Sequence, residues 1–122
     1  MRRTGIGEWI LAAIALPVLA IAAGCHSYHV DISIENRTGK AIQLLEVDYP
    51  SASFGSDTLA ANGVYHYRVQ LRGSGQIKVQ FTAADGRQIQ ITGPALVERQ
   101  EGKLEIVLLP DGKAAFNPDL TP

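Results

Sequence analysis

The sequence has one cysteine, Cys25, among its 122 residues, so no disulfide bond can form within the chain. Aromatic residues make up only 7% of the chain, and its one tryptophan, Trp9, lies close to the N-terminus. The 11 basic residues nearly balance the 12 acidic ones, and neither sign of charge gathers in a run. Because a basic excess is typical of nucleic-acid-binding proteins, its absence argues against a nucleic-acid partner.

The sequence also lacks the patterns of common catalytic and metal sites. It contains no Gly-x-Ser-x-Gly segment, no acidic loop with calcium-binding spacing, and only three histidines. We therefore expect no enzymatic activity and no cofactor. The weak metal candidates are His29 and His66, which fall on the polar faces of two predicted strands and could meet across a sheet face if those strands pair.

Residues 1–24 are expected to form a secretory signal peptide. Arg2 and Arg3 supply the initial positive charge, and residues 9–24 carry no charge at all. As a helix this apolar segment would span about 24 Å, less than the roughly 30 Å of a bilayer core, and Pro17 interrupts it. The segment therefore predicts export rather than a stable transmembrane helix.

The apolar segment ends in Ala22-Ala23-Gly24-Cys25, which resembles the lipobox of bacterial lipoproteins. In that family the cysteine thiol receives a diacylglyceryl group and a dedicated peptidase cleaves just before it. The resemblance implies that Cys25 is the acylated N-terminus of the mature protein, although the family prefers Leu where this chain has Ala22. Two or three acyl chains, such as palmitate, would hold the protein stably on a membrane.

The residue after Cys25 bears on the membrane that carries the anchor. An Asp at this position commonly retains Gram-negative lipoproteins in the inner membrane, and this chain has His26 instead. The resemblance therefore implies the outer membrane. Two alternatives to lipidation stay open, namely cleavage after Ala22 by ordinary signal peptidase and an uncleaved N-terminal anchor.

After a short tether at residues 25–28, residues 29–117 are expected to form one all-β domain, followed by a tail at 118–122. Polar and apolar residues alternate throughout this region, as they do in half-buried strands. About seven strands separated by roughly 8–12 residues favour an antiparallel β-sandwich, with a small β-barrel as the alternative. The candidate strands are 28–35, 41–49, 57–60, 64–71, 76–82, 87–92, 103–109 and 113–116. Leu44-Leu45 break the alternation and predict a β-bulge.

Two segments in the first half of the domain form a wider pattern. They are Val30-x-Ile32-x-Ile34-x-Asn36-x-Thr38-Gly39-Lys40-x-Ile42 and Leu59-Ala60-Ala61-Asn62-Gly63. An apolar strand, an Asn-x-x-Gly turn and a later Leu-x-x-x-Gly lead-in resemble the immunoglobulin-like domains of exported bacterial proteins. The resemblance implies an immunoglobulin-like sandwich, without the Cys…Trp…Cys core of antibody domains.

Residues 49–55, Tyr-Pro-Ser-Ala-Ser-Phe-Gly, are the segment most suited to binding. We expect an apolar loop that is long for a hairpin and carries Phe54 at its tip. Exposed aromatic residues are frequent interface anchors, so Tyr49 and Phe54 are the candidate partner-binding residues. The alternative is that Phe54 folds back and plugs the open end of the sandwich.

These features together predict a lipid-anchored, non-enzymatic binding or accessory protein of the bacterial cell envelope. Its expected partners are the membrane, through the lipid on Cys25, and another envelope protein, which could pair with an edge strand. The rival hypothesis is a metal or small-ligand carrier that uses His29 and His66. A third possibility is a structural surface protein with no defined ligand.

Overall fold

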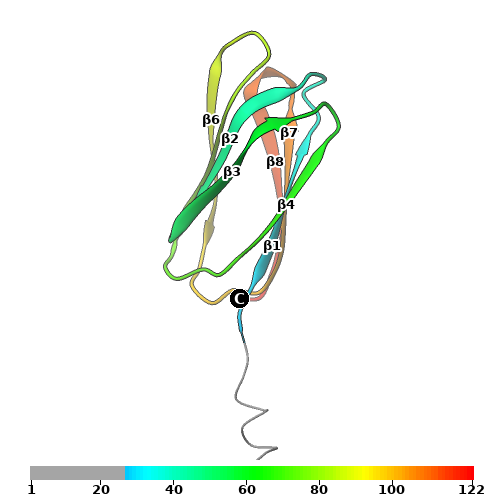
Figure 1. Cartoon of the computed structure of the whole chain (residues 1–122). Coiled ribbons are helices and arrows are strands. Elements are labelled where there is room, and N and C mark those ends of the chain that lie inside the picture. The colour runs from blue at the N-terminus through cyan, green and yellow to red at the C-terminus, as the bar shows by residue number, and fades with distance from the viewer. Residues whose placement is uncertain (1–26) are drawn as a thin grey trace, which may run out of the picture.

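Eight β-strands account for most of residues 27–122, the part of the chain that the structure, a computed structural model, describes (Figure 1). The predicted signal peptide, Cys25 and His26 lie outside the described residues. The strands are β1 (Val30–Asn36), β2 (Ile42–Tyr49), β3 (Ala52–Leu59), β4 (Val64–Val69), β5 (Gly75–Thr82), β6 (Gln88–Leu96), β7 (Gly102–Leu109) and β8 (Lys113–Leu120), with a short 3₁₀ turn, η1 (Pro110–Gly112), before β8. Residues 27–122 contain no helix long and apolar enough to cross a membrane.

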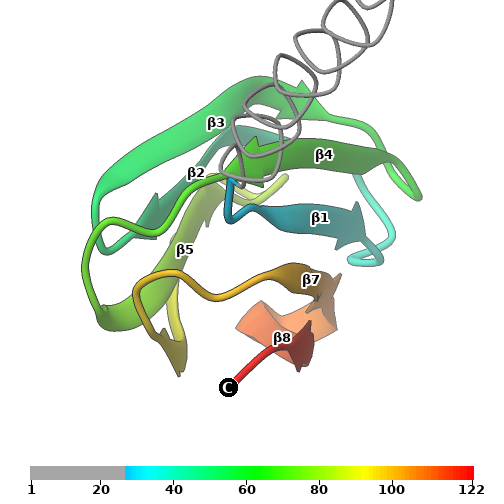
Figure 2. The same ribbon diagram turned by 90° about the horizontal axis from the view of Figure 1, so that it is seen from below.

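The strands form two four-stranded sheets that face each other, so the predicted all-β sandwich is confirmed (Figure 2). One sheet has the order β4-β1-β7-β8 and the other the order β3-β2-β5-β6. Immunoglobulin constant domains instead place four strands against three. The pairing of β1 with β7 is parallel, since the chain crosses between the sheets after β6 and returns beside β1 in the same direction.

Alternating side chains build the core between the two sheets. Val30, Ile32 and Ile34 of β1 point inward, and so do Leu104 and Ile106 of the neighbouring β7. Fully burying an aliphatic side chain of this size stabilises the fold by roughly 1.5–3 kcal/mol. The second sheet contributes Ile42, Leu45, Val47, Ile77, Val79 and Phe81.

The predicted bulge in β2 is confirmed. The pairing of β2 with β5 shifts register between Gln43 and Glu46, and Leu44 has a φ of 53° with an exposed side chain. One extra residue in the strand lets both Ile42 and Leu45 face the core.

Three predicted boundaries are wrong because strand pairing outweighs local sequence preference. Strand β3 begins at Ala52, where a loop was expected, because β2 supplies partners from Tyr49 back to Ile42. Strand β8 continues to Leu120, so most of the predicted tail belongs to the sandwich. Strand β6 likewise extends to Leu96.

The two ends of the sandwich differ in what they carry. Residues 27–29, the loops 50–51, 70–74 and 97–101, and the C-terminus lie at one end, which we call the tether pole (Figure 1). The turns 37–41, 60–63, 83–87 and 110–112 lie at the opposite end, the distal pole. The chain therefore enters the domain from the predicted lipid anchor at the tether pole.

Asn36 ties the turns of the distal pole together. Its side chain is completely buried, and Nδ2 donates hydrogen bonds to the carbonyl oxygens of Lys40, Leu59 and Ala60 at 2.8, 3.1 and 3.1 Å. Its Oδ1 accepts from the backbone N–H and the hydroxyl of Thr38 at 3.0 and 2.7 Å. The Asn-x-Thr-Gly pattern is thus a structural joint between two turns.

Candidate functional site

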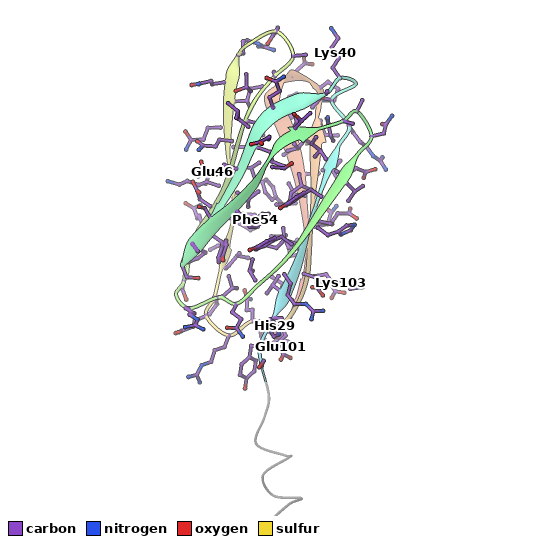
Figure 3. All side chains as sticks on the ribbon, viewed as in Figure 1. His29, Lys40, Glu46, Phe54, Glu101 and Lys103 are labelled. Atoms are coloured by element: carbon purple, nitrogen blue, oxygen red, sulfur yellow. The ribbon has the colours of Figure 1, made fainter. Side chains whose placement is uncertain are left out.

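An aromatic cluster closes the side of the sandwich where β3 and β4 lie next to each other (Figure 3). The Phe54 ring of β3 stacks on Tyr67 of β4, with centroids 4.5 Å apart and planes inclined by 15°. Tyr65 of β4 lies 6.1 Å from the same ring, and so does Tyr49 at the end of β2. Because β3 and β4 are edge strands of different sheets, the four rings hold the two sheets together at this side.

The expectation of a loop with Phe54 at its tip is therefore wrong. Phe54 lies in the middle of a strand and only 7% of its surface is exposed. The alternative, in which Phe54 folds inward, agrees with the observed burial of the ring. However, the ring packs between the edge strands β3 and β4 and does not close an open end of the sandwich. Tyr49 is half-buried, and burial raises the pKa of its hydroxyl, with a smaller contribution from Tyr67.

The aromatic residue that the cluster exposes is Tyr67. Tyr67 is 44% exposed, and Val64 at the start of the same strand is 46% exposed. Tyr67 lies on the inward side of β4, which it shares with the buried Val69, and no sequence motif singles it out. Only the packing of β4 against β3 shows that this inward residue lies at the margin of the sandwich.

Among the four edge strands of the described sandwich, β4 offers the most regular free edge. It pairs only with β1 and contains neither glycine nor proline. The other edges contain proline or glycine: Pro118 in β8, Gly93 and Pro94 in β6, and Gly55 in β3. Proline cannot donate a ladder hydrogen bond and glycine weakens a strand, so β4 is the edge best suited to accept another strand.

The outer face of the β4-β1-β7-β8 sheet carries a row of alternating charges. Arg68, Asp31, Lys103 and Asp119 occupy matching positions on the four strands. Arg68 Nε donates to Asp31 Oδ1 at 2.8 Å, and this hydrogen bond lowers the pKa of the Asp31 carboxyl and raises that of the guanidinium. An exposed pair of this kind adds little stability, but the row presents an ordered pattern of alternating charges to solvent.

A second row on the same face contains His66, Ser33, Glu105 and Asn117. Asn117 Nδ2 donates to Glu105 Oε1 at 3.1 Å. Both rows line a shallow depression of about 540 Å³ that is open to solvent. It provides hydrogen-bonding groups and charges over a broad surface.

The two metal candidates are not brought together. Strands β1 and β4 do pair, but His66 lies opposite Ser33, whereas His29 Nε2 lies 3.3 Å from Gln70 Nε2. The four-residue step from position 66 to position 70 corresponds to about 13 Å along a strand. Within residues 27–122, no group of three or more His, Cys, Asp or Glu side chains has a metal-binding arrangement. The pairing of these strands therefore does not bring the two imidazoles together.

Comparison with known proteins supports the fold and no more. No protein-family model matches the chain, and no curated protein matches it. A solved structure, described as the NMR structure of the protein from Eubacterium rectale, is similar with a TM-score of 0.55 and 14% sequence identity. The match covers 77% of this chain and 93% of that one, and at this identity it establishes a shared fold only.

Proposed function

We propose that the protein is a lipid-anchored, non-enzymatic binding module of the bacterial cell envelope, held in the outer membrane through acylated Cys25. The lipobox-like segment ending at Cys25 supports the anchor, and His26 after it favours the outer membrane. Only four residues separate Cys25 from Val30, the first residue of β1, so the sandwich is held close to the bilayer. A partner would therefore meet the domain near the membrane surface.

The observation that carries the binding role is the open edge of β4. An extended segment of an envelope protein adds to β4 as a further strand, and its backbone forms the hydrogen bonds that β1 forms on the other side. Val64 and Tyr67 supply exposed apolar contact area. His66 and Arg68 of the same strand are exposed and select the partner by charge and hydrogen bonding.

Site-specific photo-cross-linking in cells tests this role. A photoreactive amino acid replaces His66 on the β4 edge, and a matched control variant carries it at Gln90, an exposed position on the β6 edge. We expect the β4 position to capture one envelope protein reproducibly and the β6 position to capture none. Equal capture from both positions, or none from position 66, contradicts binding at β4.

The same experiment in the Cys25→Ser background tests the need for the anchor. The variant keeps the β4 edge intact but cannot receive the diacylglyceryl group. We expect it to leave the membrane fraction and lose the cross-linked product. Undiminished capture by Cys25→Ser would show that binding at β4 does not depend on a membrane tether.

A further inference from the structure

The arginines of residues 27–122 divide into two groups. Arg37, Arg68 and Arg87 pair with carboxylates at N···O distances of 3.0, 2.8 and 2.8 Å. Arg72 and Arg99 form no ion pair within the described part of the chain, and both lie in loops of the tether pole. The two guanidinium groups without a carboxylate partner thus lie where the chain leads toward the predicted lipid anchor.

Exposed apolar side chains gather at the same pole. Tyr28 is 43% exposed and Val97 is 51% exposed. Tyr28, Arg72 and Arg99 line one shallow depression, and Val97 belongs to the loop that carries Arg99. Tyrosine beside arginine is a combination typical of the membrane–water interface, where an aromatic ring sits at headgroup level and a guanidinium binds phosphate.

Hydrogen bonds fix the loop at residues 97–101 to its neighbours. The Arg99 N–H donates to the Leu71 carbonyl at 3.3 Å, and the Glu98 N–H donates to Ser74 Oγ at 3.0 Å. The Val97 N–H donates to Gln100 Oε1 at 2.9 Å. The loop therefore presents its side chains from a backbone anchored to the 70–74 loop.

The charge of the tether pole is mixed. Glu98 and Glu101 accompany Arg72 and Arg99, and His29 lies beside them (Figure 3 labels His29 and Glu101 at this end). A net positive field is therefore not what attracts a membrane to this pole. Directed arginine–phosphate hydrogen bonds, which are charge-assisted and frequently bidentate, act over the short range that a tethered domain needs.

We propose that the tether pole docks on the phospholipid surface, with Arg72 and Arg99 on headgroup phosphates and Tyr28 and Val97 at the level of the acyl-chain boundary. This inference rests on the proposed lipid anchor. Cys25 precedes Ser27 by two residues, a reach of at most about 7 Å, so the anchor holds the pole within contact of the headgroups. In the docked orientation the strands run away from the membrane surface, and the β4 edge and the distal pole stay exposed to partners.

Depth-dependent fluorescence quenching tests the docked pole. The mature protein has no tryptophan if processing removes Trp9, so one introduced tryptophan reports its own position. Val97→Trp places the reporter at the tether pole, and Ala84→Trp is the matched control in an exposed turn of the distal pole. Each acylated variant, purified from membranes, is placed in phosphatidylglycerol–phosphatidylethanolamine vesicles that contain lipids with brominated acyl chains. We expect strong quenching at position 97 and little at position 84.

Two charge variants test the role of the arginines in the Val97→Trp protein. Arg72→Gln/Arg99→Gln removes the two guanidiniums that have no carboxylate partner among the described residues, and Arg37→Gln/Arg87→Gln removes the same charge from the distal pole. We expect the first pair to weaken the docking equilibrium about fivefold for each arginine and the second pair to leave quenching unchanged. Circular dichroism of both variants checks that the fold is intact.

The outcomes separate the docking from the anchor. Equal quenching at positions 97 and 84, or equal effects of the two arginine pairs, overturns the docked pole. The intact mass of the same samples shows whether the acyl groups are present. An acylated protein without quenching at position 97 would therefore contradict the docking proposal while supporting the lipid anchor. A non-acylated protein overturns the anchor, while selective quenching at position 97 in that sample would still support docking.

Discussion

Phe54 of β3 and Tyr67 of β4 stack across the gap between the two sheets, with ring centroids 4.5 Å apart. The two strands are edges of different sheets, so this contact joins the layers at a side where no backbone hydrogen bond connects them. Phe54 is nearly buried beneath the more exposed Tyr67. The stacking therefore stiffens the strand whose outer edge we propose as the partner-binding surface.

Phe54→Ala should cost about 3 kcal/mol of unfolding free energy, because it removes a nearly buried ring and leaves a cavity. Urea denaturation measures this loss. A double-mutant cycle with Tyr67→Ala should give a coupling of about 0.5–1.5 kcal/mol beyond the apolar burial. A Phe54→Ala protein that keeps its stability but loses its partner would make Phe54 a binding anchor after all.

Asn36→Ala should destabilise the protein by about 2–3 kcal/mol, because it leaves the buried Leu59 carbonyl oxygen and two partly buried carbonyl oxygens of the distal pole without their donor. Chemical denaturation of this variant is compared with that of Asn117→Ala, whose exposed side chain bonds only to Glu105. The control should stay within about 0.5 kcal/mol of the wild type. Similar losses in both variants would refute the role of Asn36 as a joint between turns.

Gly93→Ala should cost about 1–3 kcal/mol, since a β-carbon at this position would lie 2.6 Å from Phe116 Cε1 and 2.7 Å from Ile77 Cγ2. Gly73→Ala is the matched control, where the nearest atom is Pro50 Cβ at 3.9 Å. Thermal unfolding of both proteins measures the difference. If Gly93→Ala unfolds no earlier than Gly73→Ala, the packing of β6 against β8 is looser than described.

Stability should depend on pH in opposite senses at two aspartates. The hydrogen bond from Arg68 holds the pKa of Asp31 below its ordinary 3.8. The ionised Asp31 carboxylate therefore contributes its full stability above pH 3.8, and this contribution is lost as the pH falls through the lowered pKa. Burial, with help from Glu46, raises the pKa of Asp48, so its contribution is fullest at low pH and is lost as the pH rises through the raised pKa.

The matched variants Asp31→Asn and Asp48→Asn separate these effects in denaturation experiments between about pH 7 and about pH 2. Asp31→Asn should be less stable than the wild type near neutral pH, and the gap should close in acid. Asp48→Asn should be more stable than the wild type near neutral pH by a few tenths of a kcal/mol, about the size of a surface charge effect, and this gain should also vanish in acid. Gaps that stay constant with pH would contradict both assignments.

The features that the sequence predicts correctly are local ones. Alternation in Val30–Asn36 fixes which residues face the core, and the two consecutive leucines at 44 and 45 mark the bulge. The turn at residues 110–112 likewise has local causes, since proline fixes φ at position 110 and Gly112 adopts a positive φ, as Asp111 also does. Each of these depends on residues close together in the chain.

The features that the sequence does not predict depend on pairing between distant segments. Ala52–Leu59 contains serine, alanine and glycine, which rarely favour strands, and it becomes one because β2 lies alongside it. The separation of His29 and His66 follows from the register of β1 against β4, which alternation alone leaves open. The stacking of Phe54 on Tyr67 likewise requires knowledge of which edges meet.

The mass of the N-terminal peptide of the mature protein, taken from the membrane fraction, tests the central claim most directly. A membrane-anchored binding module predicts a peptide that begins at Cys25 and carries a diacylglyceryl group on its sulfur, both absent from Cys25→Ser. A peptide that begins at Ala23 with a free thiol, or a chain that still begins at Met1, would contradict the lipid anchor.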